Sequence, residues 1–304
     1  MQKKFLCAAA AAVGLLWGSL GFSYGEMTVA VMAGDLEVNA EAAVVMDADS
    51  GRLLYAQNPD KRLANASTTK IMTALLTLEQ PDQDRYFTVD SDAIQVEGTT
   101  MGLQPGDSVT LHQLAAGMLL PSGNDAANAA AVEIAGSEEA FVRLMNQRAA
   151  ELGLENTQYR NPSGLDAEGH YSSARDLATL AAHALENEDF ADIVSKQEIR
   201  MAFGNPPYNR SLYTTNKLLE RYPYAIGVKT GYTDDAGLCL VTAAEKDGTR
   251  LIIVTLNGKD DVNTHMRLYE HFFPLLARVD LSGFTEGLSV PVTGGTRDSV
   301  AAGP

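Results

Sequence analysis

The string Ser67-Thr68-Thr69-Lys70 could generate a serine nucleophile. Serine reacts slowly until a base removes its proton, and a residue three positions later lies on the same face of a helix, within side-chain reach. A lysine amine can be that base only when it is neutral. Burial, the positive end of a helix that begins at Ser67 and a second cation nearby would each favour the neutral amine. The pair predicts acyl transfer through Ser67, although such a string alone is more often a serine N-cap followed by a solvated lysine.

The string Ser122-Gly123-Asn124 could supply further polar groups to the same site. It follows Pro121 between two helix-forming segments, so we expect a tight loop that presents a hydroxyl and an amide to a cleft. An ordinary turn, with Asn124 capping the next helix, is the alternative interpretation. This string indicates a catalytic site only in combination with the other two strings.

The string Lys229-Thr230-Gly231 lies late in the chain, in a segment with several β-branched residues. On a strand, alternation places Lys229 and Gly231 on one face and Thr230 on the other, and the glycine lets a substrate backbone approach closely. A lysine beside a threonine hydroxyl suits a free C-terminal carboxylate. The predicted reaction is therefore removal of the last residue of a peptide. The alternative is an edge strand whose lysine guards against aggregation.

The order of the three strings resembles the S-x-x-K, S-x-N, K-T-G series of penicillin-binding proteins and serine β-lactamases. Two further stretches, residues 161–178 and 216–233, are similar to segments of D-alanyl-D-alanine carboxypeptidases, the low-molecular-mass penicillin-binding proteins. The likeness covers about residues 38–275. It implies an α/β (α+β) fold of the β-lactamase/transpeptidase type, with an antiparallel sheet flanked by helices and a mostly helical subdomain.

The resemblance also implies an activity. The protein would be a serine-type carboxypeptidase that removes the terminal D-alanine from peptidoglycan stem peptides ending in D-Ala-D-Ala. Ser67 would be the acylated nucleophile, Lys70 its general base, and Ser122 the group that passes a proton to the departing amine. β-Lactams would acylate the same serine as covalent inhibitors, and no cofactor or metal would be required.

The same resemblance implies the groups that bind the substrate. Asn124 would hold the peptide of the substrate. Lys229 and Thr230, with Gly231 beside them, would bind the terminal carboxylate. Backbone N–H groups of the nucleophilic serine and of Tyr232 would form an oxyanion hole, where each donor typically contributes a few kcal/mol to the transition state.

Two other functions stay open at this point. A β-lactamase hydrolyses its acyl-enzyme rapidly and, in class A, uses a glutamate that activates water. The class A string E-x-x-L-N does not occur between the second and third strings, although Glu155 and Glu168 fall in that interval, the latter in a segment typical of a solvated loop. We therefore expect slow turnover of bound penicillin. The second alternative is a penicillin-binding sensor or wall-binding module that is acylated once.

The segments around the three strings predict the elements that position them. Residues 42–57 predict a β-hairpin, and apolar positions three and four apart predict a helix from Ser67 to about Glu79, ended by Pro81. Further helices are expected at 111–120, 125–135, 137–152, 173–185 and 262–278, and strands at 226–233, 238–244 and 250–256. Strands at both ends thus enclose a helical middle, an order typical of an α/β layer and not of a parallel βαβ series.

The two ends of the chain predict processing and a tail. Residues 1–25 combine two early lysines with an apolar run and are typical of a secretory signal peptide, with a retained membrane anchor as the alternative. The protein is therefore predicted to be exported to the periplasm or cell wall, and peripheral membrane association stays open. Residues 38–278 are the predicted catalytic domain. Residues 279–304 are a short tail, either the remnant of an all-β domain or disordered.

Composition limits the remaining choices. The 304 residues, 45% of them hydrophobic, can bury a full core, and a net charge of −16 argues against a nucleic-acid partner. Neither a G-x-S-x-G nor an H-E-x-x-H string occurs in the sequence. His265 and His271 are expected on the surface of the closing helix. Cys239, within an apolar strand, is expected to be a small buried hydrophobe.

Overall fold

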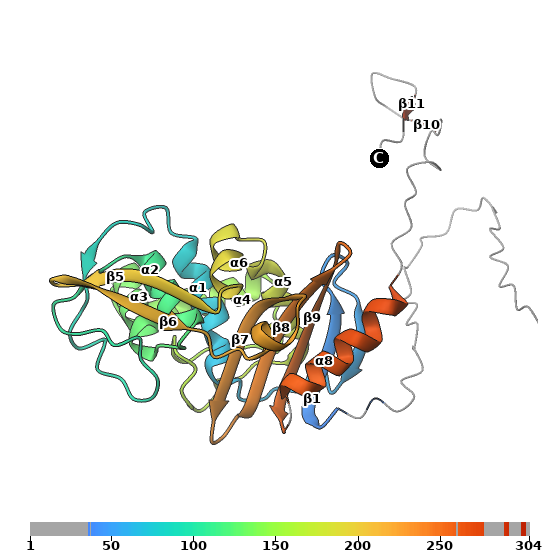
Figure 1. Ribbon diagram of the computed structural model, residues 1–304, viewed down its shortest axis with the longest axis horizontal. Coiled ribbons are helices and arrows are strands. Elements are labelled where there is room, and N and C mark those ends of the chain that lie inside the picture. The colour runs from blue at the N-terminus through green and yellow to red at the C-terminus, as the bar shows by residue number, and fades with distance from the viewer. Residues whose placement is uncertain (1–35, 37, 260, 277–288, 292–298, 302–304) are drawn as a thin grey trace, which may run out of the picture. The chain divides into compact units, whose positions relative to one another are not determined.

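The computed structural model describes residue 36 and residues 38–259, 261–276, 289–291 and 299–301. Its central element is a five-stranded antiparallel sheet with the strand order β2-β1-β9-β8-β7 (Figure 1). The strands are β1 (Ala40–Asp47), β2 (Leu53–Gln57), β7 (Ala225–Thr233), β8 (Gly237–Lys246) and β9 (Thr249–Gly258). The predicted early hairpin and the three predicted late strands are confirmed. Because β1 pairs with β9, segments from both ends of the sequence share one sheet.

The hairpin of β8 and β9 has the shortest connection in this sheet. Lys246 pairs with Thr249, so only Asp247 and Gly248 lie between the strands. Their φ angles are +50° and +74°. A two-residue type I′ turn needs positive φ at both positions, which Asp-Gly supplies readily.

The helical middle largely follows the prediction. Its main helices are α2 (Leu111–Leu119), α3 (Asn124–Ala135), α4 (Glu138–Glu151) and α5 (Ala174–Ala184). The helix expected from Ser67 differs at its start. Ser67 lies in the 3-10 turn η1 (Ala66–Thr69), and α1 (Lys70–Leu78) begins at Lys70. Such turns are frequent at helix N-termini, where the first N–H groups have no helical partner.

The structure also holds elements beyond those predicted. Between α5 and β7 lie α6 (Glu188–Val194), the paired strands β5 (Glu198–Gly204) and β6 (Pro207–Tyr213), and α7 (Leu218–Arg221). Two short strands, β3 (Phe87–Thr88) and β4 (Ser108–Val109), pair in the segment before α2. β5 lies against α2 and β4. The β5–β6 hairpin thus belongs to the helical part of the structure.

The closing helix is α8 (Asp261–Phe272), followed by the 3-10 turn η2 (Phe273–Leu275). The last two residues of the predicted helix, 277 and 278, lie outside the described residues, as does the predicted signal peptide, residues 1–25. Within the predicted tail, β10 (Ser289–Pro291) pairs antiparallel with β11 (Ser299–Ala301). The proposed boundaries of signal, catalytic domain and tail stay predictions.

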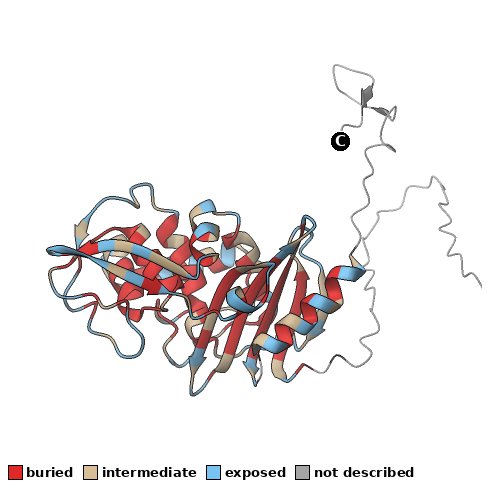
Figure 2. Cartoon of the chain, in the orientation of Figure 1, coloured by how far each residue is buried: buried red, intermediate tan, exposed pale blue. Residues whose placement is uncertain are grey.

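Each face of the sheet packs on its own core. Along β1, Val44 and Met46 contribute to the core that includes α1 and α5, while Ala43 and Val45 contribute to the core that includes α8. The two-residue period of a strand produces this division. Figure 2 shows the buried residues along the central strands and the helices beside them. Cys239, on β8, is buried in the first of these cores, as predicted.

His265 corrects the sequence prediction. It is fully buried between α8 and the sheet instead of lying on the surface. Its ring nitrogens lie 2.7 Å from Thr242 Oγ1 and 2.9 Å from Thr255 Oγ1, and Tyr269 OH lies 2.7 Å from the same Thr242 oxygen. Hydroxyls on the strands therefore provide partners for both nitrogens. Burial lowers the pKa of His265 to about 3, so the ring is neutral near pH 7.

We predict that His265 makes the folded protein sensitive to mild acid. The unfolded chain binds a proton at this residue near pH 6.5, whereas the folded chain does not until about pH 3, so stability is lost as the pH falls. From pH 7 to pH 5 the free energy of unfolding should fall by about 2 kcal/mol more in the wild type than in His265→Gln. Urea unfolding at both pH values measures the difference, and equal losses in the two proteins would contradict the prediction.

Candidate active site

The first string places Ser67 and Lys70 in direct contact. Ser67 is partly exposed in η1, and Lys70, the first residue of α1, is fully buried. Lys70 Nζ lies 2.9 Å from Ser67 Oγ. The same nitrogen lies 2.7 Å from Asn124 Oδ1 and 2.6 Å from Ser163 O. Two of the three predicted strings therefore meet at one amine.

The three neighbours of Lys70 Nζ have different hydrogen-bonding capacities. The backbone oxygen of Ser163 can only accept. Asn124 Nδ2 donates to Glu97 O at 2.7 Å, and this contact turns Oδ1, the accepting atom, towards Lys70. A neutral amine has two N–H groups and one lone pair. If the two N–H groups point at these acceptors, the lone pair points at the hydroxyl of Ser67.

The second string forms the expected loop between α2 and α3. Ser122 has a φ of +67°, an unusual conformation for a residue with a side chain. Thr99 Oγ1 donates to Ser122 O at 2.7 Å, and Asn124 N donates to Thr99 O at 2.7 Å. Asn124 begins α3, but its side chain does not cap that helix, since it contacts Lys70 and Glu97. The turn therefore presents both side chains to the cluster.

The third string lies on β7, the strand at one edge of the five-stranded sheet. Lys229 is fully buried, and its Nζ donates to Ser122 Oγ at 3.0 Å and to Thr230 O at 2.8 Å. Thr230 Oγ1 lies 2.6 Å from Thr215 Oγ1. Lys229 therefore connects the third string to the second, and Thr230, the next residue, forms a pair of hydroxyls with Thr215.

Gly231 lets β7 approach the nucleophile closely. A Cβ atom at this position would lie 2.9 Å from Ser67 N and 3.1 Å from Thr68 N, closer than side chains normally come. Tyr232, the next residue, is 63% exposed, and its hydroxyl donates to Asp234 Oδ1 at 3.3 Å. The backbone of β7 is thus beside the N–H of Ser67, while the side chain of Tyr232 lies in solvent.

Burial lowers the pKa of both lysines. Removal from water, and then the charge of Lys229, hold the pKa of Lys70 well below its usual range, with the carboxylate of Asp125 opposing the shift. Burial lowers the pKa of Lys229 to about 7. Two of the three effects expected to make Lys70 neutral, burial and a second cation, therefore operate here.

Three contributors to the site were not among the predicted residues. Ser163 contributes a backbone oxygen, Glu97 fixes the amide of Asn124, and Thr215 faces Thr230. Ser163 lies in the segment 161–178 that carried the resemblance, and Thr215 directly precedes the second such segment. A backbone oxygen leaves no trace in residue type, so sequence patterns could mark the region but not the atom.

The described part of the chain offers no cluster of three or more histidine, cysteine or acidic side chains that could hold a metal ion. In that same part, no helix is both long and apolar enough to cross a membrane.

The sheet, the helical middle and the serine–lysine cluster define a protein of the transpeptidase-like fold. The Streptomyces K15 DD-transpeptidase superposes with a TM-score of 0.74 at 30% identity, over 78% of this chain and 98% of that one. A D-alanyl-D-alanine carboxypeptidase structure from Mycobacterium tuberculosis H37Rv gives a TM-score of 0.75 at 34% identity, over 80% of this chain and 94% of that one. The predicted fold class is confirmed.

Sequence comparison specifies the family. Residues 27–260 match the profile of D-alanyl-D-alanine carboxypeptidases. The D-alanyl-D-alanine carboxypeptidase DacF of Bacillus subtilis (strain 168) is 41% identical over 229 residues, which are 74% of this chain. The chain belongs to the D-alanyl-D-alanine carboxypeptidase family. The match spans 59% of the length of DacF.

We predict that Gly231→Ala destabilises the protein by about 1–3 kcal/mol, because the added methyl group must push β7 away from η1. The matched control is Gly258→Ala on β9, where the nearest atom to a new Cβ would be 3.7 Å away, an ordinary contact. That change should stay within about 0.5 kcal/mol. Urea unfolding of the three proteins measures both values, and equal stabilities of the two variants would contradict the close contact.

Proposed function

We propose that this protein is a serine-type D-Ala-D-Ala carboxypeptidase that removes the terminal D-alanine from peptidoglycan stem peptides. The observation that carries the proposal is the 2.9 Å contact between Lys70 Nζ and Ser67 Oγ, made by an amine that two acceptors hold in place. A buried neutral lysine can take the proton of a serine at neutral pH. Family membership supports a D-alanyl-D-alanine end as the substrate.

In the proposed acylation, Ser67 Oγ forms a bond to the carbonyl carbon of the scissile peptide, and the hydroxyl proton passes to Lys70 Nζ. The C–N bond then breaks as Ser122 gives its proton to the departing amine, and the proton held by Lys70 passes to Ser122 Oγ, so that Lys70 is neutral again and Ser122 is again a hydroxyl. Lys229 Nζ donates to Ser122 Oγ, which leaves the hydroxyl proton of Ser122 free for the leaving group. In deacylation, water attacks the ester carbonyl while Lys70 takes a proton from that water, and Lys70 then gives this proton to Ser67 Oγ as the C–O bond to the serine breaks.

The groups around β7 are proposed to bind the substrate. Lys229 and the hydroxyls of Thr230 and Thr215 would hold the terminal carboxylate. A bound carboxylate favours the ammonium form of Lys229, whose pKa in the free protein is lowered to about 7. Backbone N–H groups of Ser67 and Tyr232 would stabilise the oxyanion, and Asn124 would hold the peptide.

A β-lactamase is the weaker alternative. Its acyl-enzyme needs a base that activates water quickly, and two glutamates considered for this role, Glu155 and Glu168, are both exposed. Near Lys70, Ser163 contributes its backbone oxygen, and a peptide oxygen cannot act as a base at neutral pH. We therefore propose slow loss of bound penicillin.

Export to the extracytoplasmic envelope is part of the proposal. It rests on the signal-like residues 1–25 and on the substrate, since peptidoglycan lies outside the cytoplasmic membrane. Peripheral membrane association stays a prediction.

We predict repeated release of free D-alanine from a peptide ending in D-Ala-D-Ala, together with a persistent penicillin adduct on Ser67. Ser67→Ala should abolish the adduct and lower D-alanine release by at least about a thousandfold, because the variant lacks the hydroxyl that forms the ester. The matched control is Ser50→Ala, at an exposed turn between β1 and β2, which should change neither. Mass spectrometry detects the adduct, and a coupled assay follows D-alanine.

Three outcomes would contradict the proposal. An adduct that survives in Ser67→Ala would remove Ser67 as the nucleophile. A single acylation without repeated D-alanine release would favour the sensor. Rapid destruction of penicillin by the wild type would favour the β-lactamase.

A further inference from the structure

Arg210 on β6 is an almost buried arginine outside the three strings. Its side chain is 11% exposed. The guanidinium carbon lies 4.3 Å from the ring centroid of Phe203 on β5 and 4.1 Å from that of Tyr208 on β6. Two aromatic rings of the hairpin therefore hold the guanidinium in one place and shield it from water.

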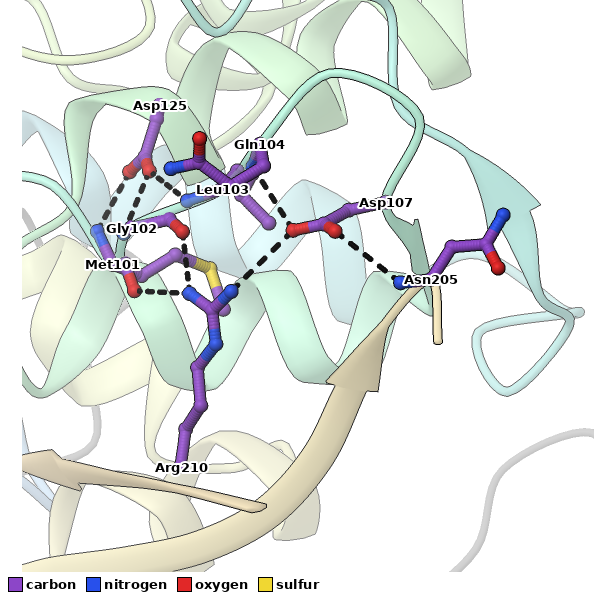
Figure 3. Close-up of polar contacts among 8 residues, drawn as sticks. All are labelled: Met101, Gly102, Leu103, Gln104, Asp107, Asp125, Asn205 and Arg210. Carbon is purple, nitrogen blue, oxygen red and sulfur yellow. Dashed lines mark hydrogen bonds and ion pairs between the residues drawn. The ribbon is translucent and has the colours of Figure 1, made fainter. Parts of the chain in front are cut away.

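The guanidinium binds the segment that precedes β4. Arg210 Nη1 donates to Gly102 O and, at 3.3 Å, to Met101 O (Figure 3). Its Nη2 lies 3.5 Å from Asp107 Oδ2. The other oxygen of Asp107 accepts from Asn205 N at 3.3 Å, at the tip of the hairpin. Both ends of residues 101–107 are thus attached to the β5–β6 hairpin, through Arg210 and through its connecting turn.

The same segment is bound on its other side by Asp125, the second residue of α3. The carboxylate of Asp125 accepts from Met101 N at 2.8 Å, Gly102 N at 3.0 Å and Leu103 N at 2.9 Å. Figure 3 shows Met101 and Gly102 between the two charged groups. Asp125 binds their N–H groups, and Arg210 binds their C=O groups. Each charged group contacts only the N–H groups or only the C=O groups, so both are needed to fix the orientation of these residues.

Residues 97–99, just before this segment, form hydrogen bonds to the second string, Ser122-Gly123-Asn124. Thr99 Oγ1 donates to Ser122 O, Thr99 O accepts from Asn124 N, and Glu97 O accepts from Asn124 Nδ2. All three distances are 2.7 Å. The position of Ser122 and the orientation of the Asn124 amide therefore depend on where residues 97–103 lie.

The hairpin has a second connection to the same loop. Beyond the end of β6, Thr215 N donates to Leu120 O at 3.2 Å, two residues before Ser122. Thr215 Oγ1 also contacts Thr230 Oγ1. A displacement of β6 would therefore reach the second string along two paths.

We propose that Arg210 is a positioning residue for Ser122 and Asn124, acting through residues 97–103. This inference rests on the proposed function, since it concerns the proton that Ser122 gives to the leaving amine. Without Arg210, the backbone oxygens of Met101 and Gly102 lose their shared donor while Asp125 keeps the N–H groups. The segment can then rotate on Asp125, and Thr99 no longer fixes the turn at Ser122.

Two substrates with different leaving groups can distinguish a role of Arg210 in positioning Ser122 from a general structural role of Arg210. An amine must receive a proton as the C–N bond breaks, whereas a thiolate leaves a thioester without one. A displaced Ser122 should therefore slow acylation by a peptide more than acylation by a matched thioester. Loss of folded protein would lower both rates by the same factor.

The experiment compares acylation by a peptide ending in D-Ala-D-Ala with acylation by its thioester analogue. In Arg210→Met we expect the peptide rate to fall at least about tenfold and the thioester rate by less than about threefold. Ser122→Ala should shift the ratio in the same direction, and Asp107→Asn, a milder change, should shift it less. The matched control is Arg200→Met, since Arg200 is an exposed arginine on β5 paired with Glu198, and it should leave both rates unchanged.

The outcomes separate this inference from the proposed function. If the wild type releases D-alanine but Arg210→Met and Asp107→Asn keep the wild-type ratio of the two rates, the positioning role is overturned alone. If Arg210→Met does not fold, the ratio in Asp107→Asn decides. A wild type that never releases D-alanine would overturn the proposed function and this inference with it.

Discussion

The site depends on the burial of two lysine amines, those of Lys70 and Lys229, in one small cluster. A buried ammonium is costly, so each amine must either lose its proton or find acceptors. Lys70 has two fixed acceptors and the hydroxyl of Ser67, and its pKa is lowered by burial and by Lys229. The chemistry of Ser67 follows from this balance, because a lysine exposed to water would stay protonated and could not act as a base.

The fold satisfies this constraint by bringing three distant segments together. The turn η1 and the first residue of α1 carry the serine and its base, the loop leading into α3 carries Ser122 and Asn124, and the edge strand β7 carries Lys229. Gly231 permits the close approach of β7 to η1, and residues 97–103 hold the turn from behind. The sheet depends on pairing between β1 and β9, so the site exists only when segments from both ends of the sequence have met.

The sequence predicted the sheet, most of the helices and the contact of Lys70 with Ser67, because amphipathic periods, caps and motif spacing are local signals. It failed where partners are distant or are backbone atoms. His265 was expected on the surface of the closing helix, but it is buried between α8 and the sheet, against two strand threonines. The β5–β6 hairpin was also not predicted, although the turn residues Gly204-Asn205-Pro206-Pro207 stand between β-forming residues in the sequence. The segment around Ser163 was marked by the resemblance, but residue types could not identify its backbone oxygen as a partner of Lys70.

The most direct test of the account is the charge of Lys70 in the free protein. Side-chain NMR of isotopically labelled lysines follows each amine with pH, and the spectrum of Lys70→Arg identifies the signal of Lys70. We expect this amine to lose its proton well below the usual pKa of 10.5, because burial and the charge of Lys229 lower the pKa of Lys70. A Lys70 signal that stays cationic up to about pH 10 would contradict this expectation.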